Sequence, residues 1–529
     1  MRQLESPPLT AADTLEGRTF LLTGATGFLG QAVLSHALRE LPTARFKLLI
    51  RDGKRESAAE RLEGKVRDSA AFEPARRQCG KEFFEADFQR RVSVVSGDLS
   101  KEGLGIREPR HVMAGVDLVI HCAADVEFHP PLDRALELNT LGPLRVLELT
   151  RHMASPRMLH VSTNFVAGTR TGRVAEPEDP RGEYPRARTL NLPFDAKQEL
   201  EDCLSLIRRV EAELGDQLHE ARLRERVGVD ASESAVRRER RRGLDARLTT
   251  EGTQRAQFWG WPNTYLYTKA MGEQLLLAHA AQTRCAIART AILSPAEALP
   301  VPGWHQGTPP LTPVARMIRE GLRVLPGNPR LILDVLPVDH AAAGVLQVAM
   351  ALLGGQARTV YHVGSSGSNP LTLARLLQGV SDAVRATTPR GPGARGVVEA
   401  LEAALPVMAL PRQAYEVLGV PSAQKAIGIL SRLLPSLPGL QPRRRAEVRS
   451  RLKRKLREMD YAKRVIDVSL PFMHDYSYEF QTDNLVALRA SLPPGERVRF
   501  PFEPERIDWD RYVRDVFVPA ACPPAESVR

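Results

Sequence analysis

The chain has 529 residues, which is too long for one core of ordinary size, so two or three domains are expected. Its net charge of +11 suits an anionic ligand, a nucleic acid or an anionic membrane surface, and does not select among them. The five cysteines are widely spaced and form no CxxC pair, which indicates a reducing compartment and argues against a zinc site. With neither an apolar leader nor an apolar run of membrane-spanning length, the sequence predicts a cytoplasmic protein.

A glycine-rich turn lies between the first predicted strand, 20–22, and the first predicted helix, 31–39. Gly24 permits a sharp turn off the strand, Gly27 lets the backbone approach a pyrophosphate, and Gly30 lets the helix pack on the strand. The free N–H groups at the start of the helix favour the phosphates. The turn therefore predicts a dinucleotide site rather than an ordinary strand–helix connection. Its candidate contacts are Thr23, Gly24, Thr26, Gly27, Phe28, Leu29 and Gly30.

The second predicted strand, 46–50, is followed directly by Arg51. In dinucleotide folds an acidic side chain at this strand end binds the ribose 2′-hydroxyl, whereas an arginine accommodates a 2′-phosphate. Arg51, with Lys54 or Arg55 nearby, therefore favours NADP over NAD. A solvated basic loop is the alternative interpretation of this stretch.

Strands are also predicted at 91–95, 116–121, 158–161, 285–289 and 360–363. The earlier strands alternate with helical stretches at the spacing of βαβ units. This alternation predicts an α/β fold with a parallel, doubly wound sheet of the Rossmann type.

Side chains at the ends of two of these strands add further cofactor contacts. Asp98 and Leu99 follow the third strand, where an Asp–Leu pair typically lies beside the adenine. Ala123 and Ala124 follow the fourth strand, and small residues there let the chain pass close to the nicotinamide side of the cofactor. Together with the glycine turn and Arg51, they complete the predicted NADPH site.

Tyr265 and Lys269 are four residues apart on a predicted helix and therefore share one face of it. The lysine ammonium favours the phenolate and brings the tyrosine pKa, ordinarily about 10, toward a value useful for proton transfer; it is also expected to hold the nicotinamide ribose. Thr163, at the end of the fifth strand, can donate a hydrogen bond to a carbonyl oxygen as charge develops on it. Asn139 is expected to order backbone and water behind the pair. Tyr267 competes for the tyrosine role, but its position two residues from Lys269 predicts another direction.

A helical insertion interrupts the predicted sheet at about 195–250. Asp195 can cap its first helix, and apolar residues recur there at roughly helical spacing. Residues 237–242 are strongly basic. The insertion either covers the site or its edge, or forms a solvated helical hairpin.

The predicted NADP-binding domain, 15–385, is followed by a linker rich in Pro, Gly and Arg at 387–395 and by a mostly helical domain at 396–529. A basic helix at 443–455 could lie on an anionic membrane, and a solvated helix is the alternative. The aromatic residues of 500–517 are expected to pack a core.

Short motifs with a family resemblance cover most of residues 19–365. They are TGATGFLG at 23–30, LLIR at 48–51, GDLS at 97–100, HCAADVEF at 121–128, LNTLG at 138–142, HVSTNFVAG at 160–168, GWPNTYLYTKAMGE at 260–273, PGW at 302–304 and LPVDH at 336–340. This set resembles the fatty acyl-CoA reductases, a branch of the extended short-chain dehydrogenase/reductase superfamily. FPFEPERIDW, near the carboxyl terminus, is similar to bacterial members. The long arginine-rich insertion departs from the shorter segment of simpler members.

By this resemblance Thr163, Tyr265 and Lys269 carry the catalytic roles, and the glycine turn and Arg51 hold NADPH. The implied substrate is a long-chain acyl-CoA, whose anionic phosphates fit the basic balance of the chain. The implied product is the fatty alcohol, formed through the aldehyde, and the aldehyde itself is the alternative product. The apolar residues expected along the acyl path are Val126, Phe128, Phe165 and Val166.

Other functions stay open. A sterol dehydrogenase or sugar-nucleotide epimerase could use the same fold, but the helical carboxyl-terminal part and the WPNTY stretch count against it. A non-catalytic NADP-sensing regulator would usually lack the tyrosine or the lysine, and this chain has both. Nucleic-acid binding through 237–242 is not expected, because no recognisable module accompanies the basic run.

Overall fold

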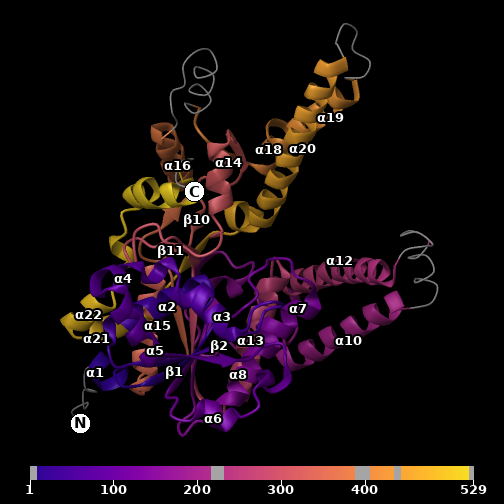
Figure 1. The fold of residues 1–529 in the computed structure, drawn as a ribbon. Coiled ribbons are helices and arrows are strands. Elements are labelled where there is room, and N and C mark those ends of the chain that lie inside the picture. The colour runs from indigo at the N-terminus through magenta and orange to yellow at the C-terminus, as the bar shows by residue number, and fades with distance from the viewer. Residues whose placement is uncertain (1–8, 216–224, 226–231, 388–404, 434–441, 524–529) are drawn as a thin grey trace.

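A seven-stranded parallel sheet forms the centre of the protein (Figure 1). The computed structural model describes residues 9–215, 225, 232–387, 405–433 and 442–523. The strand order is β12-β7-β5-β4-β1-β2-β3, which is the doubly wound arrangement that the sequence predicts. The strands are β1 (Thr19–Thr23), β2 (Arg45–Ile50), β3 (Val92–Ser96), β4 (Leu118–His121), β5 (Arg157–Thr163), β7 (Arg284–Thr290) and β12 (Val360–Val363).

Helices cover both faces of the sheet, because its strands are apolar on both sides. Phe20 and Leu22 of β1 contribute to the core beneath α2 (Phe28–Glu40) and α15 (Val338–Leu353). Leu21, between them, points to the opposite core, beneath α8 (Gly142–Thr150) and α13 (Thr264–His279). This alternation fixes the register of the central strand.

The remaining elements flank this sheet or lie in the connections. The helices are α1 (Ala11–Thr14), α3 (Ala58–Leu62), α4 (Glu73–Cys79), α5 (Lys81–Arg91), α6 (Pro109–Met113), α7 (Leu132–Leu136), α9 (Ala187–Leu190), α14 (Thr312–Arg319), α16 (Leu373–Thr387), α21 (Asp483–Ser491), α22 (Pro494–Arg499), α23 (Trp509–Arg511) and α24 (Val518–Ala521). The short strands include β8 (Ile292–Ser294), β10 (Ile332–Leu333), β11 (Val335–Pro337) and β13 (Leu371–Thr372). Among the described residues, no helix combines the length and apolar character needed to span a membrane.

The helical stretch 132–150 consists of three pieces. A π-helical turn, Glu137–Leu141, joins α7 to α8. The carbonyl of Asn139 in this turn lies against Gly272 of α13, where a Cβ would come within 2.2 Å of the oxygen. The wide turn therefore lets α13 approach the chain closely, and periodicity alone did not indicate it.

The predicted insertion forms an antiparallel pair of helices, α10 (Ala196–Gly215) and α12 (Glu233–Trp259), which Figure 1 shows extending away from the sheet. Asp195 accepts a hydrogen bond from the backbone N–H of Lys197 at 2.8 Å, as the predicted cap requires. The base of the pair packs on α7 and α13. It therefore contacts the helix that carries Tyr265 from outside the sheet.

The carboxyl-terminal part packs against the region 15–385 through strands and helices. β15 (Tyr478–Phe480) pairs with β6 (Gly172–Val174), β14 (Met408–Leu410) pairs with β9 (Val324–Pro326), and α21 contacts α15 and β12. The tail aromatics are buried, as expected: Phe500, Phe502, Trp509, Tyr512 and Phe517. The two predicted domains thus share one hydrophobic core. Their boundary stays a prediction, since the linker beyond Thr387 lies outside the described residues.

Candidate active site

A cavity of about 1020 Å³ lies at the carboxyl ends of β1, β4 and β5. This is where open α/β sheets bind ligands. All twelve residues predicted from the glycine turn and the strand ends line it: Thr23, Gly24, Thr26, Gly27, Phe28, Leu29, Gly30, Arg51, Asp98, Leu99, Ala123 and Ala124. The predicted catalytic residues Thr163, Tyr265 and Lys269 line the same cavity. The fold therefore brings together side chains that are far apart in the sequence.

The glycine turn has the backbone geometry that a bound pyrophosphate needs. Gly24 has φ = +76°, and a Cβ there would lie 2.8 Å from the backbone nitrogen of Ala123. A Cβ on Gly30 would lie 2.2 Å from the carbonyl oxygen of Gly24. Gly27 occupies the N-cap of α2, so the free N–H groups of the first helical turn face the cavity without a side chain before them. These residues fit the diphosphate of a nicotinamide dinucleotide.

Two arginines lie where the adenosine half of such a cofactor would end. Arg51 and Arg61 both line the cavity, and the Arg61 guanidinium donates a hydrogen bond to the carbonyl of Arg51. Lys54 and Arg55, the nearby cations expected from the sequence to accompany Arg51, are not among the lining residues. Arg61 was not predicted from the sequence; it comes from the far end of α3, ten positions after Arg51. The sequence could have indicated Arg61 only through a prediction that α3 folds back over the end of β2.

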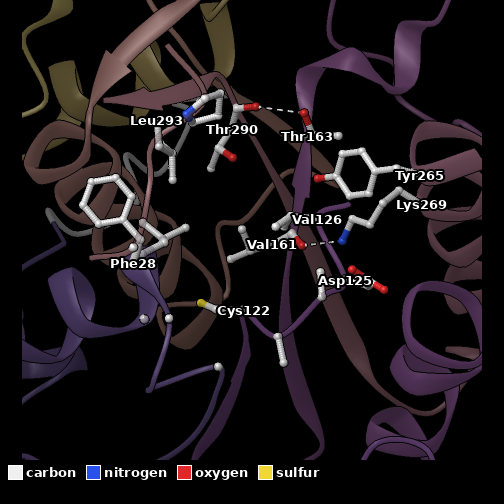
Figure 2. Close-up of a pocket in the computed structure, with 18 of the residues that line it drawn as sticks. Phe28, Cys122, Asp125, Val126, Val161, Thr163, Tyr265, Lys269, Thr290 and Leu293 are labelled. Carbon is white, nitrogen blue, oxygen red and sulfur yellow. Dashed lines mark hydrogen bonds between the residues drawn. The ribbon is translucent and has the colours of Figure 1, made fainter. Parts of the chain in front are cut away.

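Tyr265 and Lys269 project from the first turns of α13 into the cavity, across from Thr163 (Figure 2). Asn263 caps the helix, since its side chain accepts a hydrogen bond from the backbone N–H of Leu266 at 3.0 Å. The cap fixes where the helix begins, and the four-residue spacing then places the phenol and the amine one above the other. The predicted shared face is therefore present.

Lys269 is held by the strand beneath it. Its side chain is 1% exposed, and its amine donates a hydrogen bond to the carbonyl oxygen of Val161 at 2.9 Å. Nε2 of His160 lies 3.4 Å from the same amine. Burial lowers the pKa of Lys269 to about 8, and the nearby Glu273 carboxylate opposes that change. The lysine thus titrates close to neutral pH.

The pKa of Tyr265 differs from the sequence expectation. Burial raises it above the usual value, and the charges of Asp125 and Glu273 raise it further. The expected lowering by Lys269 is therefore wrong for the protein without ligands, because burial desolvates the phenolate and the neighbouring carboxylates repel it. The phenol is protonated at neutral pH, which is the state that a proton donor requires.

Thr163 and Asn139 have different surroundings. The Thr163 hydroxyl donates to the carbonyl of Thr290 at 3.3 Å and accepts from the backbone N–H of Phe165 at 3.3 Å (Figure 2 shows the first bond). The amide of Asn139 accepts from the N–H of Asp125 at 2.9 Å and donates to its carbonyl at 3.0 Å. Asn139 is buried and is not a lining residue. It orders the backbone after β4, and its predicted water contact stays a prediction.

Two other residues close to the site have side chains capable of chemistry, Tyr267, which competed for the tyrosine role, and Cys122. Tyr267 is not among the lining residues; its hydroxyl donates to Glu199 and lies 3.1 Å from the sulfur of Cys203, both on α10. It joins α13 to the insertion. Cys122 lines the cavity, but burial raises the pKa of its thiol to about 12, so it is not a thiolate at neutral pH.

An apolar wall continues the cavity beyond Tyr265. Phe128 and Phe165 line it, as predicted, and Phe472 packs between them with ring centroids 5.5 and 5.2 Å away. Val126 also lines the cavity, whereas Val166 does not: its carbonyl accepts the indole N–H of Trp261. Three lining residues come from the carboxyl-terminal part and were not predicted from the sequence: Ser469, Phe472 and Met473. None of the described residues of the insertion lines the cavity, which favours the solvated hairpin; whether the insertion covers the edge of the site stays a prediction.

Comparisons with known proteins agree with this geometry. A sequence model of the male sterility protein family matches residues 22–345. Probable fatty acyl-CoA reductase 5 of Arabidopsis thaliana is 28% identical, and the match covers 96% of this chain and 98% of the relative. Alcohol-forming fatty acyl-CoA reductase of Simmondsia chinensis is 29% identical, with 68% of this chain and 69% of the relative covered.

One solved structure shares the fold over most of its length. The terminal R domain from the myxalamid PKS-NRPS biosynthetic pathway superposes with a TM-score of 0.51 at 16% identity, covering 91% of this chain and 89% of that chain. The family match covers more than half of this chain and includes the glycine turn, Thr163 and the Tyr265–Lys269 pair. The chain therefore belongs to the fatty acyl-CoA reductase branch of the extended short-chain dehydrogenase/reductase superfamily, whose members are oxidoreductases that use a nicotinamide cofactor.

Proposed function

We propose that this protein uses NADPH to reduce a long-chain fatty acyl-CoA thioester, through the aldehyde, to the fatty alcohol. The observation that carries the proposal is the continuity of one cavity. It runs from the glycine turn past Thr163, Tyr265 and Lys269 to the aromatic wall around Phe472. The names of the two plant relatives support the acyl-CoA substrate, and one of them also supports the alcohol as product.

In this proposal the side chains of the cavity stabilise charge on the substrate oxygen. When bound, the reduced nicotinamide supplies a hydride to the thioester carbonyl carbon. Tyr265, which is protonated at neutral pH, donates its proton to the carbonyl oxygen. The Lys269 ammonium stabilises the phenolate that remains. The Thr163 hydroxyl turns away from the carbonyl of Thr290 and donates to the same substrate oxygen.

The product of this first reduction is a hemithioacetal. Its carbon–sulfur bond breaks and the coenzyme A thiol leaves, so that an aldehyde remains beside Tyr265. No covalent enzyme intermediate is needed, and the protonated Cys122 offers no nucleophile for one. A second hydride and a second proton convert the aldehyde to the alcohol, so two NADPH are consumed for each thiol released.

Two features of the chain support the binding of anionic ligands, NADPH and an acyl-CoA. Arg51 and Arg61 lie together at the adenosine end, where a 2′-phosphate would be bound. The chain as a whole carries a net charge of +11, which favours association with the phosphates of coenzyme A.

The test is an assay of purified protein with NADPH and a panel of acyl-CoAs of increasing chain length. Oxidation of NADPH should accompany thiol release, and kcat/KM should rise with chain length, because each buried methylene contributes about 0.8 kcal/mol. A UDP-sugar and a 3-hydroxysteroid serve as controls for the alternative activities. Turnover of either control substrate without turnover of any acyl-CoA would contradict the proposal.

A further inference from the structure

Three carboxyl-terminal helices form an arm that extends away from the sheet. They are α18 (Arg412–Leu418), α19 (Val420–Leu433) and α20 (Pro442–Leu470). Figure 1 shows α19 and α20 side by side in the upper right, and α18 lies at their base. We use the name "arm" for these three helices.

The outer side of the arm carries large apolar side chains that nothing in the described chain covers. On α19, Ile429, Leu430 and Leu433 are 57%, 46% and 55% exposed, and their spacing places them on one face of the helix. On α18, Val417 and Leu418 are 69% and 65% exposed. Exposed apolar residues that gather on one element mark an interaction surface more often than isolated ones do. We call these five residues the apolar face of the arm.

The partner helix of the same arm is strongly basic. Residues 443–457 of α20 contain nine arginines and lysines and one acidic residue, Glu447. The half-buried residues of this stretch are the apolar Val448, Leu452 and Leu456, which recur every four positions. The described charged side chains of this stretch therefore lie on the rest of the helix surface. Lys425 adds an exposed positive charge one turn before Ile429 on the apolar face.

The combination of positive charge and exposed apolar surface indicates which class of partner the arm binds. A second copy of the chain would bring two basic helices together, and their repulsion opposes such a dimer. An anionic lipid surface complements both features, because its headgroups attract Lys and Arg while its acyl region accepts Leu and Ile. We propose that the arm docks on anionic membranes, with the apolar face inserted at the interface and α20 against the headgroups.

The other end of the arm reaches the cavity. Ser469, near the end of α20, and Phe472 and Met473, in the π-helical turn that follows (Pro471–Asp475), line the apolar wall. One continuous helix thus connects the basic surface with the place proposed for the acyl chain. Docking through this arm would keep the cavity near the membrane, from which an apolar substrate comes and to which an apolar product returns.

The experiment is co-sedimentation of the full-length protein with lipid vesicles. One set contains phosphatidylcholine mixed with phosphatidylglycerol, and the other contains phosphatidylcholine alone. The wild-type protein should sediment with the mixed vesicles, be released by high salt, and stay in solution with the neutral vesicles. Two arm variants, I429S/L430S/L433S and R449E/K453E/R457E, should each lower the partition coefficient about tenfold or more.

A matched control comes from another exposed apolar residue. Val498 of α22 is 80% exposed and lies outside the arm, so Val498→Ser should sediment as the wild type does. Circular dichroism and acyl-CoA reduction in the absence of vesicles should be unchanged in all three variants, since none of the altered residues lines the cavity. Equal binding to both vesicle types, no binding to either, or full binding by the arm variants would overturn the proposal. A wild-type dimer that I429S/L430S/L433S converts to a monomer would overturn it in favour of a second copy.

Discussion

The amine of Lys269 and Nε2 of His160 lie 3.4 Å apart, and both residues are buried. Burial lowers the pKa of His160 well below its ordinary value, and the charge of Lys269 lowers it further. The imidazole is therefore neutral, and its Nε2 can accept a hydrogen bond from the ammonium when the proton is on Nδ1. Together with the carbonyl of Val161, this contact holds the charged lysine beneath Tyr265.

The first prediction concerns pH. The pKa of Lys269 is lowered to about 8, so the lysine is charged below that pH and loses its charge as the pH rises through it. The charged form stabilises the Tyr265 phenolate, so kcat should be highest below about pH 8 and fall at more alkaline pH. His160→Leu removes a hydrogen-bond acceptor for the Lys269 ammonium and should move the decline in kcat to lower pH. His160→Gln keeps an acceptor and should bring the decline part of the way back to its wild-type pH. A pH profile of kcat that is identical in the wild type and His160→Leu would exclude a role for the contact.

The second prediction separates the two tyrosines of α13. Tyr265→Phe removes the proton donor from the cavity, so kcat should fall by about 10²–10⁴ while NADPH binding persists. Tyr267→Phe removes a buried hydrogen bond to Glu199 and should lower the free energy of unfolding by about 1–3 kcal/mol with little change in kcat. Steady-state kinetics and thermal unfolding of both variants measure the two effects. A larger loss of kcat in Tyr267→Phe would move the reaction to the other tyrosine.

The third prediction concerns the choice between NADPH and NADH. A charge-assisted contact from Arg51 to the 2′-phosphate is worth roughly 1.5–3 kcal/mol, or about ten- to hundredfold in preference. Arg51→Ala should therefore reduce the ratio of kcat/KM for NADPH to that for NADH, and Arg61→Ala should do so more weakly. Lys54→Ala is the matched control, because Lys54 is a neighbouring cation outside the cavity lining. If the wild-type protein uses both cofactors equally well, the assignment of Arg51 fails.

The sequence predicted the parts of the fold and site that depend on local pattern. The glycine turn, the strand ends and the Tyr265–Lys269 spacing all follow from short stretches, and the structure gathers them in one cavity. Arg61 was missed because its place in the cavity depends on how α3 returns over the end of β2. Phe472 was missed because it lies more than two hundred residues from Tyr265, just after α20. The residue pattern of α20 distinguishes its exposed side from its half-buried side but does not show what lies next to its end. The predicted direction of the Tyr265 pKa shift was wrong, because the burial that raises this pKa is known only from the folded protein.

The fourth prediction tests the close packing of the glycine turn. In Gly30→Ala the new Cβ would lie 2.2 Å from the carbonyl oxygen of Gly24, so α2 must shift away from β1. We expect a loss of stability of about 1–3 kcal/mol and much weaker NADPH binding. Gly428→Ala, in α19, is the control, because its Cβ would meet no atom within 4 Å. It should instead stabilise its helix by about 0.5–1 kcal/mol. Wild-type affinity for NADPH in Gly30→Ala, measured by fluorescence titration, would show that the turn does not bind the phosphates.

The last prediction is that the aromatic wall retains the aldehyde for the second reduction. The aldehyde is more electrophilic than the thioester from which it came, so Thr163 and Tyr265 can polarise and protonate it again. Whether this happens depends on whether the acyl chain stays bound while the oxidised cofactor leaves and NADPH enters. Phe472 contacts both Phe128 and Phe165 and is therefore the side chain whose removal should weaken that retention most.

In the wild type, two NADPH should be consumed for each thiol released, and the alcohol should accumulate. In Phe472→Ala the ratio should fall toward one as free aldehyde escapes, and in Phe472→Leu, which leaves a smaller void, it should fall less. Phe83→Ala is the control for losing an aromatic ring, because Phe83 is 66% exposed and outside the cavity lining. Thermal unfolding of each variant separates loss of fold from loss of retention, since an unfolded fraction lowers the rate without altering the ratio. A wild-type ratio near one, with aldehyde as the final product, would contradict the alcohol-forming proposal, and an unchanged ratio in Phe472→Ala would show that the aromatic wall does not hold the aldehyde.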